Sequence, residues 1–331
     1  MTSFSDIIGH KDIISHMKEA IASHKISHCY ILSGPKLSGK MMLSEAFAAS
    51  LVCENYHDEP CHSCHSCKQA EGHNHPDIIY VTHEKPNVIT VGEIRQQLID
   101  TVSIRPYSAP YKIYIVEDAQ MLNLQAQNAL LKTIEEPPEY AVIMLLTTNP
   151  QAFLPTILSR GLMLHLHPVS SEVISDYLIN NMHISPSMAD ICVSFSQGNV
   201  GSAISLASSS DFEHLRQEVV MVAENITQMD EFELLSAIRH IKDYNLKMSD
   251  YFDLLAVWYR DVLLYKATAD ANNVIFKDNI YTIKSQSSHI DYSGLNDIIE
   301  ALGKAKIRLE ANVNPEITVE MLLWLIKHTI N

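Results

Sequence analysis

The sequence predicts an α/β domain built on a parallel β-sheet, followed by a region made only of helices. Three observations predict this fold class. Short apolar runs alternate with helical patterns through the first 168 residues, a glycine-rich loop follows the first run, and no convincing strand pattern occurs from Ser170 onward. At 331 residues the chain is too long for one ordinary core, so we expect two or three domains.

Five short apolar runs are the expected strands, and they lie at 28–33, 77–81, 112–117, 141–147 and 162–166. Continuous apolar strands separated by helices are typical of a parallel sheet that is covered on both faces. Helical periodicity occurs between these runs, over residues 7–23, 40–53, 91–101 and 125–135.

The pattern changes after Pro168, and the expected domain boundaries follow from this change. We expect a nucleotide-binding-type domain over 1–168, a small helical domain with three short helices over 169–208, and a domain of longer amphipathic helices over 209–331. The boundary near 208, inside a run of serines, is the weaker of the two.

Composition excludes several classes of protein. The formal net charge is −15, whereas a protein that grips DNA alone usually shows a basic face, so strong independent DNA binding is not expected. The first residues lack the basic and apolar segments of a signal peptide, and no apolar stretch approaches 18 residues. We therefore expect a cytoplasmic chain without a membrane span, in which disulfides are not expected.

The glycine-rich loop follows the first expected strand and opens the next helix. Gly34, Gly39 and Lys40 have the spacing G-x-x-x-x-G-K, in which backbone amides approach phosphate oxygens and the lysine reaches the outer phosphates. The next residue should be Ser or Thr, whose hydroxyl binds Mg²⁺. Here it is Met41, and a thioether is a poor ligand for this hard cation. The phosphate loop is therefore degenerate, and whether ATP or ADP occupies it stays open.

An acidic pair, Glu117-Asp118, ends the third expected strand. Hydrolysing enzymes with this kind of loop typically have Asp before Glu, one holding Mg²⁺ through water and one orienting the attacking water. The reversed order changes the reach of each carboxylate by one methylene, and positioning errors near 1 Å can cost about a hundredfold in rate. We therefore expect impaired hydrolysis.

Four of the six cysteines lie within fifteen residues and have the spacing C-x7-C-x2-C-x2-C. They are Cys53, Cys61, Cys64 and Cys67. Four thiolates suit a tetrahedral structural zinc site, so we expect a zinc module inserted over about 53–67. The alternatives for the fourth ligand are His57, His62, His65, His73 and His75. An iron–sulfur cluster and free thiols are the competing interpretations, whereas Cys29 and Cys192 lie in apolar patterns and are expected in the core.

Several segments, in order along nearly the whole chain, resemble the clamp-loader branch of the AAA+ family. The most specific is residues 128–138, NALLKTIEEPP, and the others are residues 4–10, 26–32, 147–149, 158–160 and 315–325. His10 stands where the family usually has Gln, and Gly161 where it has Cys. The resemblance implies an AAA+ P-loop domain, a helical lid domain and an all-α collar domain.

The resemblance also implies roles for single residues. Arg160 corresponds to an arginine finger that reaches the nucleotide of a neighbouring subunit, where its planar, always-charged donors stabilise the developing phosphate charge. Asn149 corresponds to the sensor at the end of the fourth strand, and Gly201 falls where active ATPase subunits carry a sensor arginine. Together with Met41 and the reversed acidic pair, Gly201 indicates the non-hydrolysing type of subunit.

The implied protein is a rigid assembly subunit of a bacterial DNA polymerase III clamp loader without independent ATPase activity. Its implied partners are the gamma/tau ATPase subunits and the delta subunit, with the sliding clamp and primed DNA reached through the complex. The first alternative is a catalytically active gamma-like ATPase. A small-molecule nucleotide kinase is disfavoured by the zinc cluster and the helical second half, and a zinc-centred nucleic-acid-binding module by the negative charge.

Overall fold

The computed structural model describes residues 3–55, 58–85, 87–230, 233–234, 248–311 and 313–330. The chain divides into two compact units, Met1–Val173 with Gly198–Ser202, and Ile174–Gln197 with Ala203–Asn331. The predicted division into three domains stays a prediction.

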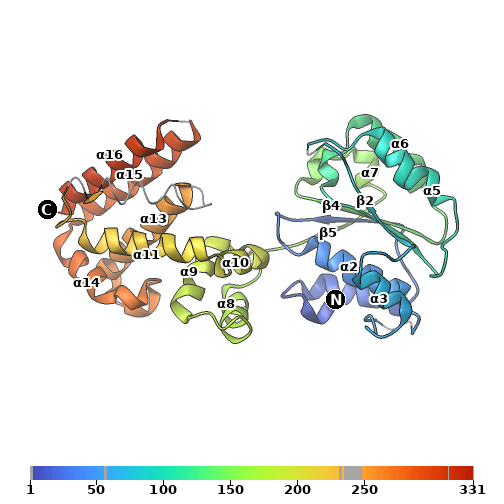
Figure 1. Ribbon diagram of the computed structural model, residues 1–331, viewed down its shortest axis with the longest axis horizontal. Helices are drawn as coiled ribbons and strands as arrows, with labels where there is room; N and C mark the ends of the chain where they lie inside the picture. The colour runs from blue at the N-terminus through green and yellow to red at the C-terminus, as the bar shows by residue number, and fades with distance from the viewer. Residues whose placement is uncertain are drawn as a thin grey trace. The chain divides into compact units, whose positions relative to one another are not determined.

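A five-stranded parallel sheet organises the first unit, with the strand order β2-β3-β4-β1-β5 (Figure 1). The strands are β1 Cys29–Ser33, β2 Ile78–Val81, β3 Lys112–Val116, β4 Ala141–Thr147 and β5 Leu162–His165. Each lies within a run that the sequence predicts as a strand. Because parallel strands end at one edge of the sheet, the segments that follow β1, β3 and β4 meet there.

Helices cover both faces of this sheet, as the sequence predicts (Figure 1). On one face are α1 Lys11–Ala22, α2 Lys40–Val52 and α3 His65–Glu71. On the other are α4 Val91–Ile94, the π-helical η2 Arg95–Ile99, α5 Asp100–Val102, α6 Leu124–Glu135 and α7 Pro155–Leu158. Short 3-10 turns are η1 Phe4–Asp6, η3 Ala119–Met121 and η4 Pro150–Ala152.

Alternate residues of each strand supply the two cores of the first unit. In β1, Tyr30 and Leu32 pack in the core with α1 and α2, whereas Cys29 and Ile31 pack in the core with α6 and α7. All residues of β1, β3 and β4 are buried, which explains why these strands read as unbroken apolar runs.

The second half of the chain is helical throughout its described residues. The three short helices expected over 170–208 are α8 Ser171–Asn180, α9 Pro186–Ser196 and α10 Val200–Ala207. The longer helices are α11 Ser210–Asn225, α13 Met248–Thr268, α14 Ile280–His289, α15 Tyr292–Glu310 and α16 Pro315–Ile330, with 3-10 turns η5 Ala271–Asn273 and η6 Lys277–Asn279. None of the described helices combines the length and apolar composition that a membrane span needs.

Helix α13 lies at the centre of the second unit. The Trp258 indole is fully buried and donates to the Gln286 side-chain oxygen at 2.9 Å. The Gln286 amide in turn donates to the carbonyl of Ala223 at 2.7 Å. This chain of hydrogen bonds joins α13, α14 and α11 through polar groups that burial would otherwise leave unpaired.

Candidate functional site

The phosphate loop lies between β1 and α2, where the sequence predicts it. The Gly34 amide donates to the Thr147 carbonyl at 3.1 Å, which ties the loop to the end of β4. Gly39 has a φ of +94° and precedes the first residue of α2, a backbone conformation that glycine adopts without strain. Leu37, which is not a glycine, also has a positive φ of +62°.

Lys40 is folded back onto its own loop. Its ammonium group donates to the carbonyls of Gly34 at 2.7 Å and Pro35 at 2.6 Å. Burial lowers the pKa of Lys40, while the nearby Asp118 and Glu117 oppose that shift. The lysine therefore occupies loop carbonyls, and a phosphate ligand would have to compete with them.

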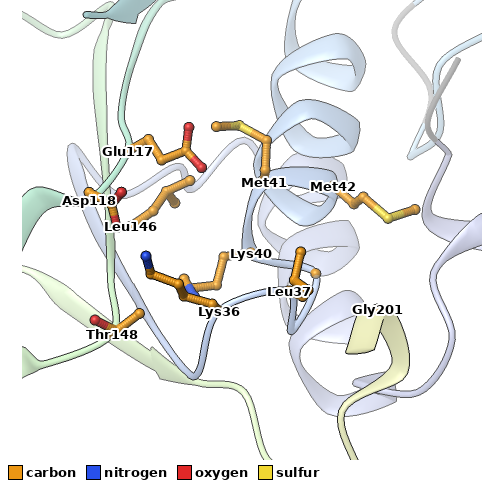
Figure 2. A pocket seen from close by; sticks show the side chains of 11 residues that line it. Lys36, Leu37, Lys40, Met41, Met42, Glu117, Asp118, Leu146, Thr148 and Gly201 are labelled. Carbon is orange, nitrogen blue, oxygen red and sulfur yellow. The ribbon is translucent and has the colours of Figure 1, made fainter. Parts of the chain in front are cut away.

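A cavity of about 380 Å³ opens beside this loop (Figure 2). Its wall consists of Lys36, Leu37, Gly39, Lys40, Met41, Met42, Glu117, Asp118, Leu146, Thr148 and Gly201. It thus brings together the loop lysine and both acids of the pair that the sequence singles out. The cavity has the position of a nucleotide site, with two cationic and two anionic side chains in a mainly apolar wall.

Met41 lies where a magnesium-binding hydroxyl would be expected. In Figure 2 its thioether points toward the Glu117 carboxylate, while Met42 extends away from it. A Mg²⁺ ion requires oxygen ligands in near-octahedral geometry, and the Met41 sulfur offers none. Glu117 is present, but the chain supplies only part of a magnesium site here.

The acidic pair and the end of β4 are joined through Gln120. Asp118 has a φ of +46°, and its carboxylate accepts from the Gln120 amide at 2.8 Å. The Gln120 oxygen accepts from the Thr148 backbone amide at 3.1 Å. Gln120 therefore fixes the spacing between the two strand ends. This role is not predictable from the sequence, because nothing in a polar turn residue indicates it.

Thr148, rather than Asn149, lines the cavity at the end of β4. The Asn149 side chain instead accepts from the Gln151 amide at 3.1 Å and caps the short turn η4. The family resemblance implies a sensor role for Asn149, whereas the structure places the preceding residue, Thr148, in the cavity wall.

Gly201, at the start of α10, packs directly against the phosphate loop. A Cβ atom on residue 201 would lie 2.3 Å from the Leu37 carbonyl oxygen and 3.0 Å from the Leu37 Cβ. Nearby, the Asn199 amide donates to the Lys36 carbonyl at 2.6 Å. The close approach leaves no room for a side chain at position 201, so no sensor arginine can stand there without displacing the loop.

Arg160 follows α7 and is not part of the described cavity wall. Its guanidinium forms an ion pair with Glu135 at 3.0 Å, and about two-fifths of each side chain is exposed. The same guanidinium donates to the Thr156 carbonyl at 3.1 Å and to the Ser159 hydroxyl at 3.3 Å. Arg160 is thus accessible, but it is docked on its own chain.

The segment before Arg160 is anchored by Gln127, a buried residue of α6. Its amide donates to the carbonyls of Leu122 and Ala152, each at 3.0 Å, and its oxygen accepts from the Leu154 amide at 2.8 Å. This role was not predicted from the sequence. A glutamine at an inward position of an amphipathic helix was the available signal.

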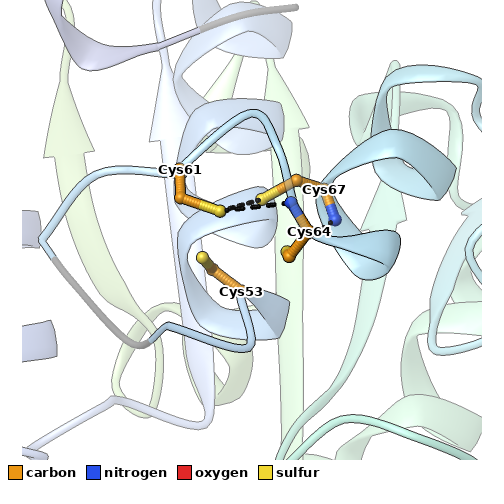
Figure 3. A group of neighbouring side chains, drawn as sticks. All are labelled: Cys53, Cys61, Cys64 and Cys67. Atoms are coloured by element: carbon orange, nitrogen blue, oxygen red, sulfur yellow. Dashed lines mark hydrogen bonds between the residues drawn. The ribbon is translucent and has the colours of Figure 1, made fainter.

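The four predicted cysteines converge on one point (Figure 3). Their sulfur atoms all lie within 4.8 Å of one another, and the Cys61 and Cys67 sulfurs are 3.9 Å apart. Zinc–sulfur bonds of about 2.3 Å in a tetrahedron place sulfurs about 3.8 Å apart, so the donor set fits Zn²⁺. Cys53 comes from the end of α2, Cys64 caps α3, and Cys67 lies within α3.

Backbone amides support the cluster. The Cys64 amide donates to the Cys61 sulfur at 3.4 Å, and the Cys67 amide to the Cys64 sulfur at 3.3 Å. Hydrogen bonds, led by that of the Ser63 hydroxyl, lower the pKa of Cys61 to about 5, whereas burial raises the pKa of Cys67. A metal would favour the deprotonated form of all four thiols.

The histidines offered as alternative ligands do not join the cluster in the described part of the chain. His62 contacts the Ser3 hydroxyl at 2.5 Å, and His75 accepts from the Asp77 amide. His73 lies 3.7 Å from Glu45. His57 lies outside the described residues. Cys29 and Cys192 are buried, as predicted.

Comparison with known proteins then decides the family. A model of the family described as DNA polymerase III, delta subunit, matches residues 9–170, and a model of the C-terminal part of that subunit matches residues 210–328. The chain belongs to the family of DNA polymerase III clamp-loader subunits. The five-stranded parallel sheet with helices on both faces confirms the predicted α/β fold class.

Relatives in this clamp-loader family carry different subunit names. The chain is 29% identical to the Bacillus subtilis DNA polymerase III subunit delta′, covering 95% of each chain. It is 27% identical to the Bacillus subtilis subunit tau, over 98% of this chain but 62% of tau. It is 34% identical to the Haemophilus influenzae subunit tau/gamma, over 53% of this chain and 25% of that protein.

Solved structures of related proteins are more distant. A gamma-subunit-related protein from Thermotoga maritima is 19% identical, with a TM-score of 0.45 over 96% of this chain and 99% of that one. The Bacillus subtilis DNA clamp loader delta protein is 15% identical, with a TM-score of 0.37 over 95% and 99%.

Proposed function

We propose that this clamp-loader subunit is the delta-prime subunit, a non-hydrolysing assembly subunit that supplies Arg160 to the ATP site of a neighbouring subunit. The observation that carries the proposal is the cavity wall at position 41, where a thioether faces Glu117. Without a hydroxyl there, the chain lacks a magnesium ligand that hydrolysis needs.

Two further contacts support a cavity that does not hydrolyse ATP. Lys40 is hydrogen-bonded to loop carbonyls, and Gly201 packs on Leu37 at the position where an active subunit would carry a sensor arginine. Arg160 is exposed and does not line the described cavity of its own chain. An arginine so placed is suited to act on a nucleotide held by another subunit.

The proposed partners are the gamma/tau ATPase subunits and the delta subunit, and through the complex the sliding clamp and primed DNA. The surface of α16 supports such assembly. Apolar residues at spacings of four, three and one form an exposed stripe, Ile317, Met321, Trp324 and Leu325, while the opposite face of the helix is buried. A helix that is apolar on both faces is typical of one that packs against a partner.

The four cysteines are proposed to hold a structural zinc ion. The donor set is closed by four thiolates, so the metal would fold this module and leave no position for a substrate. The proposed location of the subunit is the cytoplasm, as part of the DNA polymerase III holoenzyme.

A gamma-like ATPase is the second candidate function. Lys36, Lys40, Glu117 and Asp118 still line the cavity, which favours some binding of a nucleotide. Magnesium-dependent turnover by the isolated chain would support this candidate.

The test compares ATP hydrolysis by the isolated chain with that of a complex rebuilt with its partner subunits, using wild type, Arg160→Ala and Arg160→Lys. We expect a silent isolated chain and an Arg160→Ala complex that assembles but is slower by about a thousandfold at the site that receives the arginine. Arg160→Lys keeps the charge but loses the planar donors, so it should rescue only part of the rate. An active isolated chain and an unaffected Arg160→Ala complex would refute the proposal.

A further inference from the structure

Glu135, the last residue of α6, is the only ion-pair partner that the described residues give to Arg160. The carboxylate lies 3.0 Å from one terminal nitrogen of the guanidinium. The other terminal nitrogen donates to the Thr156 carbonyl and the Ser159 hydroxyl. Both terminal nitrogens are therefore engaged by the chain itself before any phosphate arrives.

We propose that Glu135 is a latch: a positioning residue that holds Arg160 against its own subunit and must release it before the guanidinium can reach a neighbour's phosphate. This inference rests on the proposed trans-acting role of Arg160. It adds a residue that restrains the arginine, and it predicts that removing the restraint makes hydrolysis by the complex faster.

The charges explain why the pair restrains the arginine. A carboxylate in contact with the guanidinium offsets its positive charge and would repel an approaching phosphate. In the transition state the Arg160 guanidinium is needed where negative charge develops on the phosphate. If the Glu135 carboxylate stayed in contact, it would weaken the stabilisation of that charge. The Glu135 carboxylate thus competes with the phosphate for the N–H donors of the Arg160 guanidinium.

The exposure of the pair explains why the latch can open. About two-fifths of each side chain is in contact with solvent, and exposed ion pairs of this kind are weak. A triphosphate carries several negative charges and several acceptor oxygens, and bidentate arginine–phosphate contacts are among the stronger hydrogen bonds in proteins. The neighbour's nucleotide can therefore displace the single carboxylate.

Helix α6 fixes where the latch lies. Gln127, eight residues before Glu135, holds the Ala152 carbonyl and the Leu154 amide just before α7 begins at Pro155. Pro137 and Pro138 follow the helix and prevent its extension. The same helix therefore anchors the segment that leads to Arg160 and presents the carboxylate that binds its guanidinium.

The experiment measures ATP hydrolysis by the rebuilt complex that contains this chain. The variants are Glu135→Gln, which removes the charge, Glu135→Asp, which keeps it, Arg160→Ala, and the double variant Glu135→Gln/Arg160→Ala. The matched control is Glu139→Gln, which removes the same charge from an exposed residue four positions along. Melting temperatures of the isolated variants confirm that each is folded.

We expect Glu135→Gln to raise the rate of the complex by about two- to fivefold, the range that loss of an exposed ion pair can produce. Glu135→Asp and Glu139→Gln should stay within about twofold of wild type. In the Arg160→Ala background, Glu135→Gln should change nothing, because the latch has no arginine left to hold.

Different results overturn different parts of the inference. If Arg160→Ala slows the complex but Glu135→Gln does not raise the rate, the latch is wrong and the trans-acting arginine stands. If Glu135→Gln raises the rate equally without Arg160, Glu135 acts by another route and the latch is again wrong. If Arg160→Ala leaves the complex unaffected, the proposed function itself fails, and the latch fails with it.

Discussion

The carbonyl oxygen of Leu37 lies 2.3 Å from the point that a Cβ atom on Gly201 would occupy. Leu37 belongs to the phosphate loop and Gly201 to the first turn of α10, so residues more than 160 positions apart in the sequence are in backbone contact. The contact leaves room only for glycine at position 201, and Leu37 on the other side has a positive φ of +62°.

Replacing Gly201 by Ala should therefore destabilise the chain. The added methyl group forces the loop or the helix to shift, and overpacking of this kind costs about 1–3 kcal/mol. Gly303→Ala in α15 is the control, because a Cβ there meets nothing within 4 Å and alanine favours a helix by about 0.5–1 kcal/mol. The urea concentration at the midpoint of unfolding should fall for Gly201→Ala and rise for Gly303→Ala. Equal shifts of the two midpoints would contradict the close approach of Gly201 to Leu37.

Replacing Met41 by Thr should restore a magnesium ligand without restoring catalysis. The hydroxyl supplies the missing oxygen, so we expect nucleotide binding in Mg²⁺ to tighten by about tenfold or more, with no gain in EDTA. Turnover by the isolated chain should stay at background because Gly201 and the acidic pair are unchanged. The fluorescence anisotropy of a labelled nucleotide measures this binding. Met42→Thr is the control, because the Met42 side chain points away from Glu117.

Each chain should carry one zinc ion. Metal analysis should find about one equivalent, Cys61→Ser should lose it, and Cys192→Ala, which alters a buried cysteine outside the cluster, should retain it. Removal of the metal should unfold the local module, since structural zinc contributes about 10 kcal/mol or more in small zinc domains. Visible absorbance typical of an iron–sulfur cluster would exclude the zinc assignment.

The exposed stripe of α16 should be needed for assembly. Met321→Glu places a charge at its centre, where about half of the side chain is exposed, so the isolated chain should fold normally but join the complex poorly. Tyr281→Glu is the matched control, because it changes another highly exposed residue in the same unit, outside the stripe. Gel filtration of the mixed subunits distinguishes the two; normal incorporation of Met321→Glu would argue against the stripe as an interface.

Asp77 should make the stability of the chain depend on acid pH. Burial opposes its ionisation, but amides of Tyr107, Ser108 and Ala109 donate to the carboxylate, and on balance its pKa is lowered. A lowered pKa gives stability that is present above the unfolded value near 3.8 and lost as pH falls through the folded value. Asp77→Asn should cost about 1–3 kcal/mol at pH 7.

The matching measurement for Asp77 is the pH dependence of urea unfolding. The difference in the free energy of unfolding between wild type and Asp77→Asn should narrow below about pH 4. Asp176 is an exposed residue of α8, and Asp176→Asn should leave the pH profile of the free energy of unfolding unchanged. A gap that stays constant through acid pH would show that the carboxylate charge is not what Asp77 contributes.

The sequence predicts the sheet and the clustering of the four cysteines well because those features are local. An apolar run such as Ala141–Thr147 is buried on both sides and reads as a strand, and the spacing of the four cysteines reflects one metal-sized cluster. Glycine spacing likewise indicates the phosphate loop. Such patterns need only a few neighbouring residues.

Contacts between segments that are distant in the sequence cannot be predicted from such local patterns. Nothing local distinguishes Thr148 from Asn149 as the residue that faces the cavity, and nothing at Glu135 indicates that Arg160 will lie 3.0 Å away. Gln127 and Gln120 act on backbone groups that become neighbours only when the sheet forms. These relationships depend on the packing of α6 and the strand ends, which a linear pattern does not contain.

Helix α2 begins at Lys40 and ends one residue before Cys53, so the loop lysine and a cysteine of the cluster stand at opposite ends of one thirteen-residue rod about 20 Å long. Nine of its residues are buried, which leaves the rod little freedom to tilt. A displacement at the cysteine end of this helix would therefore be passed to the end that carries Lys40.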